Sequence, residues 1–329
     1  MIANPLVTVI IPCYNHSKYI SKCIESVLTQ TYANIELIVI DNGSTDNSYE
    51  IIRKYLIRSN FKLIRLENNI PPGEINGPLS IALKVTSGEY ISLLFSDDWL
   101  MPDKIEKQVL LMLRSSPSVG IIYCHGYRYY ESTGIMKKWI TRSVQGYAFI
   151  DHLKNGPLVI PISPLVKKQC YQIIGVDHSW TGSEYDFFAM SQFFDFACID
   201  ECLVVMRDHE SNDGKNVRSV YDRVCKFDEE FFSNKSTLLR AGGYVSRYKS
   251  RIYLMFARDF AEINDNEFAK FAFFKAVMVR PICLLTIRGF IMLMYMLLPV
   301  PLFFRFMRLL RALRTILYNS SDKIVGKLN

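Results

Sequence analysis

The sequence lacks the short motifs that mark many nucleotide-handling and hydrolytic enzymes. It has no G-x-x-x-x-G-K-[ST] and no G-x-G-x-x-G, which excludes a P-loop enzyme and a dinucleotide-binding turn. It has no G-x-S-x-G, the strand-to-helix turn of α/β-hydrolases. The first apolar run is followed by PCYN, which is neither the D-x-D of an aspartyl phosphatase nor the Gly-rich loop of a sugar-phosphate nucleotidylyltransferase.

Paired metal-binding cysteines are also missing. The chain has eight cysteines, but no C-x-x-C pair and no histidine at zinc-finger spacing. We therefore expect reduced, structural thiols, as in cytosolic proteins. The N-terminus, MIANPLVTVII, lacks the basic start and small-residue cleavage site of a signal peptide, so none is expected.

No apolar run is long enough to predict a membrane-spanning helix. Residues 289–304 carry no charge, but they fall short of the roughly 20 residues needed and contain two prolines. In the following segment, 305–317, four arginines occupy one helical face and leucine, isoleucine and phenylalanine the other. This pattern predicts a basic amphipathic helix in a membrane interface. The alternative is a helix that packs its apolar face on the protein and exposes its arginines to water.

The net charge of +7 fits an anionic partner. Neither a zinc module nor an aromatic RNA-binding signature accompanies the basic residues, so nucleic acid is not the expected partner.

Strand-like and helix-like patterns alternate through the first hundred residues. Alternation of this kind predicts βαβ units and an α/β fold with a mainly parallel sheet. In the second half, 120–124 and 198–206 still read as strands, and the chain reads as helical after about residue 215. The expected strands of the first half are 7–11, 35–40, 61–66 and 90–95, and the expected helices are 20–28, 49–56 and 81–86.

Acidic residues follow two of these strands. Asp41 and Asp46 come after the second strand, and Asp97 and Asp98 come after the fourth. Ligands of parallel α/β sheets bind beyond the carboxyl ends of the strands, so these acids are expected to converge there. One interpretation is ordinary solvated turn residues. The other is a site for Mg²⁺ or Mn²⁺, which prefer carboxylate and phosphate oxygens.

Two stretches of the first half of the chain resemble a known family. The stretch VTVIIPCYNHSKYISKCIESVLTQTYANIELIVIDNGSTDNS, followed by GEYISLLFSDDWLMPDKIEKQ, is similar to the family 2 inverting glycosyltransferases of the GT-A fold, of the bacterial surface-polysaccharide type. The resemblance covers residues 5–115 and continues to about residue 212. It implies a Rossmann-like GT-A domain over residues 1–212 and a helical, apolar and basic C-terminal region over 213–329.

The resemblance also implies a donor site. Pro12, Tyr14 and Asn15 occupy positions that line the nucleobase pocket in the family. Asp41 and Asn42 stand where the family has two acids, one of which binds the base. A UDP-sugar is the default donor, and because the second acid is asparagine here, dTDP- and GDP-sugars are the alternatives.

The metal and phosphate contacts follow from the same resemblance. Asp98 is expected to bind Mn²⁺ or Mg²⁺, and Asp97 the ribose or the metal. In VVMRDHES, Arg207 and His209 are candidates for the diphosphate or the metal. The other interpretation of His209 is an ordinary loop histidine.

The candidate base lies in TGSEYDFF. Glu184 stands where the family usually has its catalytic carboxylate, and Asp186 is the second candidate. Ser183 replaces the first acid of the family's pair. In GPLSIALK, Leu79 and Ser80 replace an expected Arg and Asn, which leaves Lys84 as a weak substitute for a phosphate contact.

Together these features predict a metal-dependent inverting glycosyltransferase in polysaccharide biosynthesis. It would move a sugar to a hydroxyl of a lipid-linked or surface-glycan precursor. We expect it to be cytoplasmic and peripheral to the inner face of the cell membrane, held there by residues 289–317. The alternative is a catalytically inactive relative that binds nucleotide sugars or glycans.

Overall fold

The computed structural model describes residues 4–182 and 184–297. The chain forms two compact units, Met1–Tyr244 and Val245–Asn329. All the predicted site residues fall in the first unit, and the apolar C-terminal segment falls in the second.

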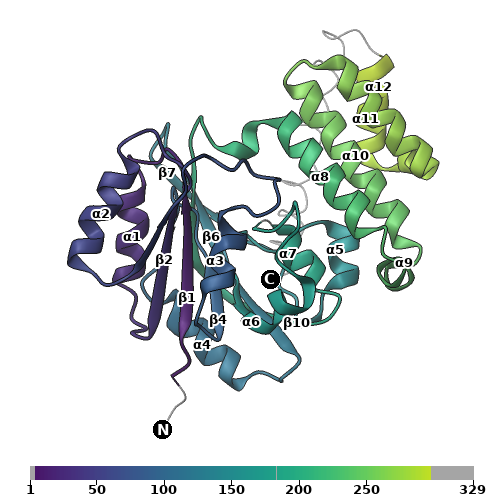
Figure 1. Cartoon of the computed structure of the whole chain (residues 1–329). Coiled ribbons are helices and arrows are strands. Elements are labelled where there is room, and N and C mark those ends of the chain that lie inside the picture. The colour runs from purple at the N-terminus through teal and green to yellow at the C-terminus, as the bar shows by residue number, and fades with distance from the viewer. Residues whose placement is uncertain (1–3, 183, 298–329) are drawn as a thin grey trace, which may run out of the picture. The chain divides into compact units, whose positions relative to one another are not determined.

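The first unit is built on one ten-stranded sheet with the order β3-β2-β1-β4-β9-β6-β10-β5, to which β7 and β8 add at β6 and β10 (Figure 1). The strands are β1 Val7–Cys13, β2 Ile35–Asp41, β3 Lys62–Arg65, β4 Tyr90–Leu93, β5 Trp99–Leu100, β6 Val119–Tyr130, β7 Ile135–Trp139, β8 Gly146–Tyr147, β9 Leu165–Lys167 and β10 Asp195–Asp208.

Six of these strands run in the same direction. β3, β2, β1 and β4 pair in parallel, and so do β6 and β10. β9 lies antiparallel between β4 and β6, so those two strands also share a direction. The predicted α/β fold with a mainly parallel sheet is therefore confirmed. Because β1, β2 and β4 are parallel neighbours, the loops that follow them meet at one edge of the sheet.

Helices cover both faces of this sheet (Figure 1). Side chains along β1 alternate between the faces. Val9 and Ile11 pack in the core shared with α1, α2 and α4, whereas Ile10 packs in the core shared with α3, α6 and α7. The helices of the first unit are α1 Ile20–Leu28, α2 Ser48–Arg58, α3 Pro78–Val85, α4 Lys104–Arg114, α5 Phe149–Asn155, α6 Lys168–Ile174, α7 Glu184–Met190, the short η1 Asp213–Lys215, α8 Val217–Phe231 and α9 Lys235–Ala241.

Helix α8 packs on α7 through aromatic side chains. The ring of Phe227 lies 4.3 Å from that of Tyr185 and 5.7 Å from that of Phe188, measured between centroids. The first compact unit therefore continues past residue 212 and includes α8 and α9.

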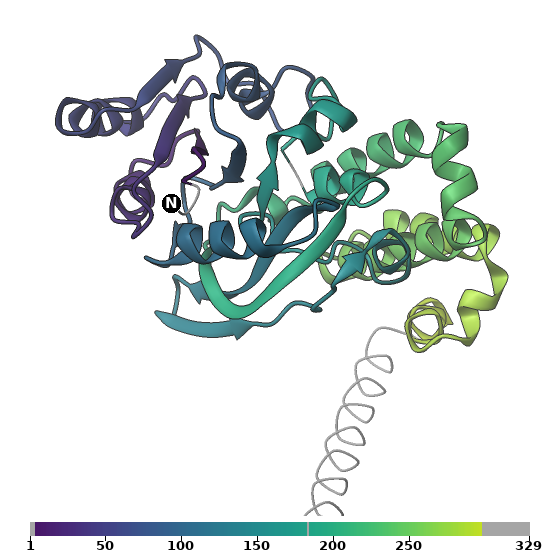
Figure 2. The ribbon, with the colours of Figure 1, turned by 90° about the horizontal axis from the view of Figure 1, so that it is seen from below.

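The second unit is helical, as the ribbons in Figures 1 and 2 show. It contains α10 Tyr244–Glu262, α11 Asn266–Val279, the short η2 Pro281–Leu285 and α12 Ile287–Leu297. Among the described residues, no helix combines the length and the apolar character that crossing a membrane requires. Of the predicted membrane segment 289–317, residues 298–317 lie outside the described residues.

Candidate functional site

The loop after β1 is tied to the loop after β2. Asn15 adopts a left-handed backbone with φ of 52°, which asparagine tolerates better than most residues. Its side-chain Oδ1 accepts hydrogen bonds from the backbone N–H groups of Thr45, at 2.8 Å, and Asp46, at 3.2 Å. Asp46 in turn accepts from the backbone N–H of Ser17 at 3.0 Å. These bonds fix the edge where the donor site is expected and leave Tyr14 exposed beside it.

The pair Asp41–Asn42 ends β2 inside the protein. Asp41 is fully buried, with Oδ2 lying 3.5 Å from Nε of Arg65. Asn42 forms a two-way pair with the peptide group of Ile70. It donates from Nδ2 to the carbonyl at 2.9 Å and accepts at Oδ1 from the N–H at 3.0 Å. A carboxylate could not donate the first of these bonds. Asparagine therefore holds the loop that follows β3.

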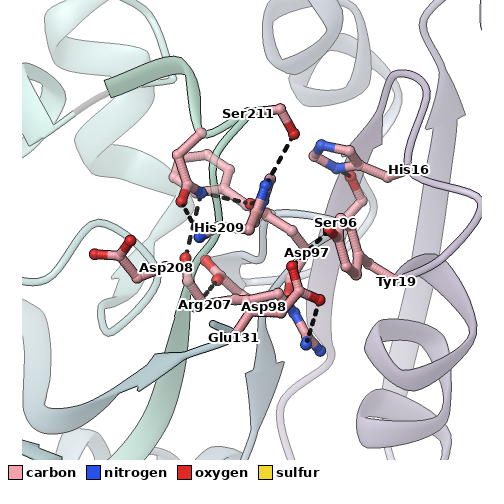
Figure 3. Close-up of polar contacts among 12 residues, drawn as sticks. His16, Tyr19, Ser96, Asp97, Asp98, Glu131, Arg207, Asp208, His209 and Ser211 are labelled. Atoms are coloured by element: carbon pink, nitrogen blue, oxygen red, sulfur yellow. Dashed lines mark hydrogen bonds and ion pairs between the residues drawn. The ribbon is translucent and has the colours of Figure 1, made fainter. Parts of the chain in front are cut away.

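The pair Asp97–Asp98 follows β4 (Figure 3). Oδ1 of Asp98 accepts the backbone N–H of Arg207 at 2.8 Å, and its other oxygen is buried with no hydrogen-bond partner among the described residues. Burial and the charge of Asp97 raise the pKa of Asp98 well above its ordinary range. Asp97 points the other way, and its Oδ2 lies 3.0 Å from Nε2 of His209 and accepts from Nδ2 of Asn212 at 3.2 Å.

His16, Asp97 and His209 form a cluster with metal-ligand geometry. One ligand atom from each side chain lies within 4.8 Å of the other two. The second ring nitrogens are oriented by serines. Nδ1 of His16 lies 2.7 Å from Oγ of Ser96, and Nδ1 of His209 lies 3.0 Å from Oγ of Ser211 (Figure 3). Burial lowers the pKa of His16, which favours the neutral imidazole that metals bind. Two imidazoles and one carboxylate fit a divalent cation such as Mn²⁺.

Arg207 is enclosed by aromatic rings. Its guanidinium carbon lies 4.8 Å from the ring centroid of Tyr19, 5.2 Å from that of Trp99 and 5.3 Å from that of Tyr129. Nε donates to the backbone carbonyl of Asp97 at 3.0 Å. The side chain is only 11% exposed. Its present contacts therefore hold the Asp97 turn against β10.

The predicted base region starts α7. Oδ2 of Asp186 accepts the backbone N–H of Gly182 at 2.8 Å, and burial raises the pKa of Asp186 to about 8. Glu184 is half-buried. Burial raises its pKa, and the charge of Arg223 on α8 opposes that rise. Ser183 lies outside the described residues. Of the two candidates, Asp186 has a structural hydrogen bond, whereas Glu184 feels the charge of Arg223, whose guanidinium pairs with Asp213.

Helix α3 offers no cation toward this site where the family has Arg and Asn. Leu79 is buried, and its side chain lies next to Gly182. Oγ of Ser80 and Nζ of Lys84 both bond Oδ1 of Asp177, at 3.1 and 2.8 Å. Lys84 is therefore occupied by an exposed ion pair.

The structure thus gathers some of the predicted residues and separates others. Asp97 and His209 come together, while Asp98 lies outside the three-residue cluster. His16 and Arg223 were missed. His16 had a usable signal, because it stands in PCYNHSKY at the expected strand edge. Arg223, whose charge acts on Glu184, had none, since it lies on a helix some forty residues downstream of the base motif.

Comparison with known proteins gives one consistent answer. Residues 8–165 match the family model described as glycosyl transferase family 2. The glycosyltransferase GlyG of Streptococcus pneumoniae is 29% identical over 196 residues, which are 56% of this chain and 62% of GlyG. An uncharacterized glycosyltransferase of Haemophilus influenzae is 38% identical over 141 residues, or 42% of this chain and 54% of that protein. The chain thus spans less than two thirds of the length of these curated relatives.

Solved structures agree on the fold. TarS of S. aureus, crystallised as residues 1–349 with UDP-GlcNAc, aligns with a TM-score of 0.53 and 13% identity over 81% of this chain and 90% of that one. The mannosyltransferase PcManGT of Pyrobaculum calidifontis, in complex with GDP-Man and Mn²⁺, aligns with a TM-score of 0.56 and 16% identity over 84% and 76%. The expected GT-A type of fold is therefore confirmed. Residues 8–165, just under half of the chain, are thus similar to glycosyl transferase family 2.

Proposed function

We propose that this chain is a metal-dependent glycosyltransferase that moves a sugar from a nucleoside-diphosphate donor to a hydroxyl group of a glycan or lipid-linked precursor, with inversion at the anomeric carbon. The observation that carries the proposal is the His16–Asp97–His209 cluster, which lies at the sheet edge where family 2 transferases are expected to bind their donors. The named relatives include a chondroitin synthase of Pasteurella multocida, 39% identical over 102 residues, or 31% of this chain and 10% of that protein.

We assign the metal to Asp97, His16 and His209. Asp98 was the expected ligand, but its Oδ1 is bonded to the backbone of Arg207 and its Oδ2 is buried. When bound, Mn²⁺ or Mg²⁺ would neutralise charge on the departing diphosphate. Asn15 and Asp41 fix the edge around Pro12 and Tyr14, where the nucleobase would stack.

Two of the predicted donor-site cations are engaged in other contacts. Arg207 is enclosed by rings, and Lys84 is paired with Asp177. Arg207 acts in this proposal by holding the Asp97 turn. In place of these two side chains, the metal would supply positive charge for the diphosphate, so donor binding should depend on it.

Glu184 is the proposed general base. It would take the proton of the acceptor hydroxyl as that oxygen attacks the anomeric carbon. Burial raises its pKa, which increases its basicity, and the charge of Arg223 opposes that rise. Asp186 is assigned a structural role, because its carboxylate bonds the first turn of its own helix.

Thermal denaturation tests the proposal. The chain is heated with UDP, GDP, dTDP or CDP, each with and without Mn²⁺, and Asp97→Ala is the matched control. A ligand at about 100 times its Kd stabilises a protein by roughly 2.7 kcal/mol. We expect one nucleotide to raise the Tm only when Mn²⁺ is present, and to do so only in the wild type.

The donors to test next are UDP-GlcNAc and GDP-mannose, the ligands bound in the aligned structures. No shift with any nucleotide would contradict the donor site. A metal-dependent shift without turnover on any glycan or lipid-linked acceptor would favour the inactive binding relative.

A further inference from the structure

The segment that begins at α11 has an unusual charge pattern. Acids make up 32 of the 329 residues, or about one in ten, yet none occurs from residue 268 to residue 321. The described part of this stretch contains four cations: Lys270, Lys275, Arg280 and Arg288. The sequence continues with the four arginines of residues 305–314. The stretch is therefore uniformly basic.

Helix α11 places its large apolar side chains on the outside. Its buried face consists of small residues with one ring, namely Ala269, Ala272, Phe273 and Ala276. Phe271, Phe274 and Met278 are 46%, 60% and 83% exposed. At 3.6 residues per turn these three side chains fall within an arc of about 60°. A helix of a globular protein normally exposes its polar side to water. An exposed apolar face of this kind marks a surface that contacts a partner.

A lysine stands on the same face. Nζ of Lys275 lies 4.6 Å from the ring centroid of Phe271 and 5.6 Å from that of Tyr253. A lysine of this kind lays its stem along apolar surface and carries its charge to the edge. Apolar exposure continues directly after the helix at Ile282, Leu285 and Ile287, which are 55%, 84% and 80% exposed. We call Phe271, Phe274, Met278, Ile282, Leu285 and Ile287 the apolar-basic face, together with Lys275.

Three partners could cover such a face: residues 298–329 of the same chain, a second copy, or a lipid surface. Residues 298–329 contain four arginines before their only acid, Asp322. A second copy of the chain would bring the same cations as the face itself. Either contact would set like charges against one another. An anionic lipid surface supplies an apolar layer beneath negative headgroups, and each lysine or arginine near it gains roughly 1 kcal/mol.

We infer that the apolar-basic face docks on the interface of a membrane that contains anionic lipid. This places membrane contact in the described helices α11 and α12 and the turn between them, ahead of the amphipathic segment predicted from sequence. The inference does not depend on sugar transfer, because it rests on exposure and charge within the second unit alone.

The test is vesicle co-sedimentation of the full chain with phosphatidylcholine alone or with about 30% phosphatidylglycerol. The double variant Phe274→Glu with Met278→Glu should bind the anionic vesicles at least tenfold more weakly than the wild type. Both side chains are exposed, so the fold should survive, which circular dichroism checks. The matched control is Ile57→Glu with Leu239→Glu, at positions 85% and 84% exposed in the first unit. It should bind within twofold of the wild type.

Several other results would overturn the inference. Equal losses in both double variants would show that only net charge matters, and no loss in either would show that α11 stays off the lipid. A lipid-free wild-type dimer that Phe274→Glu with Met278→Glu dissociates would make the face a contact between copies. Hydrogen exchange gives an independent readout. Anionic vesicles should slow exchange in residues 266–287 and leave residues 48–58 unchanged, and the reverse would contradict docking through this face.

Discussion

Two pairs of polar residues look alike in sequence: Asp41–Asn42 at the end of β2 and Asp97–Asp98 after β4. The two members of each pair make different kinds of contact, and they differ in the same way in both pairs. In each pair the second residue bonds the backbone of a distant segment: Asn42 pairs with Ile70, and Asp98 accepts from the N–H of Arg207. The first residue of each pair faces a cationic or ring nitrogen, Arg65 in one case and His209 in the other.

The comparison teaches that adjacency does not make two equivalent ligands. The two residues of each pair differ because the second is held by a backbone group far along the chain. A third pair, Glu184 and Asp186 on α7, also has two different roles. Asp186 accepts the N–H of Gly182, while Glu184 feels the charge of Arg223. In the second and third pairs, the anchoring residue sets the geometry and the first residue is the one proposed for the chemistry.

The largest expected effect is a difference in sugar transfer between variants of Asp97 and Asp98. Asp97→Ala removes the carboxylate of the metal cluster and should lower transfer at least about 1,000-fold, since a bound metal contributes several kcal/mol. Asp98→Asn keeps an oxygen for the N–H of Arg207 and should retain transfer within about tenfold. Steady-state rates with the donor identified by denaturation give the measurement. If Asp98→Asn is as inactive as Asp97→Ala, the division of roles within this pair is wrong.

The next effect concerns the third pair. Glu184→Gln should lower kcat about 100- to 1,000-fold with unchanged donor affinity, because the amide cannot accept the proton. Asp186→Asn should transfer sugar at close to the wild-type rate, because the amide oxygen still accepts from Gly182. Single-turnover rates and donor titration separate the two steps. The opposite pattern, with Asp186→Asn inactive and Glu184→Gln active, would reverse the assignment.

Asp186→Asn should also change how the stability of the protein depends on pH. The pKa of Asp186 is raised by burial to about 8 in the folded chain, against an ordinary value near 4 in the unfolded one. The wild type therefore loses stability as the pH rises from about 4 to 8, because this carboxyl ionises in the unfolded chain while it stays protonated in the folded one. The variant lacks this loss, so between pH 6 and pH 9 the wild type should lose roughly 3 kcal/mol more stability than the variant. Urea unfolding at pH 6 and pH 9 checks this, and an equal pH dependence of the two proteins would contradict a buried, protonated Asp186.

The smallest effect lies in the first pair. Asn42→Asp restores the acid expected from the family but removes the donor to Ile70, and it should cost about 2 kcal/mol of stability. Asn68→Asp makes the same chemical change on an exposed side chain of the neighbouring loop and should change stability by less than about 0.5 kcal/mol. Equal urea midpoints for the two variants would show that the Asn42 pair does not hold the loop.

Much of this fold could be predicted from sequence, because its helices and strands are marked by patterns of neighbouring residues. Ile20, Cys23, Ile24 and Val27 repeat at helical spacing and are all buried on α1, and the β-branched runs became β1 and β2. The site was less readable. Which aspartate of a pair turns outward depends on bonds to residues far along the chain, such as Arg207. His16 meets His209 only after the loops beyond β1 and β10 have folded together.

The central claim is that His16, Asp97 and His209 together bind a divalent cation. The most direct measurement is titration of the full chain with Mn²⁺, followed by electron paramagnetic resonance of the free ion. We predict one site per chain, lost in Asp97→Ala, at least tenfold weaker in His16→Ala and unchanged in Asp98→Asn. A wild-type chain that binds no Mn²⁺, or an Asp97→Ala variant that binds it as tightly as the wild type, would contradict the account.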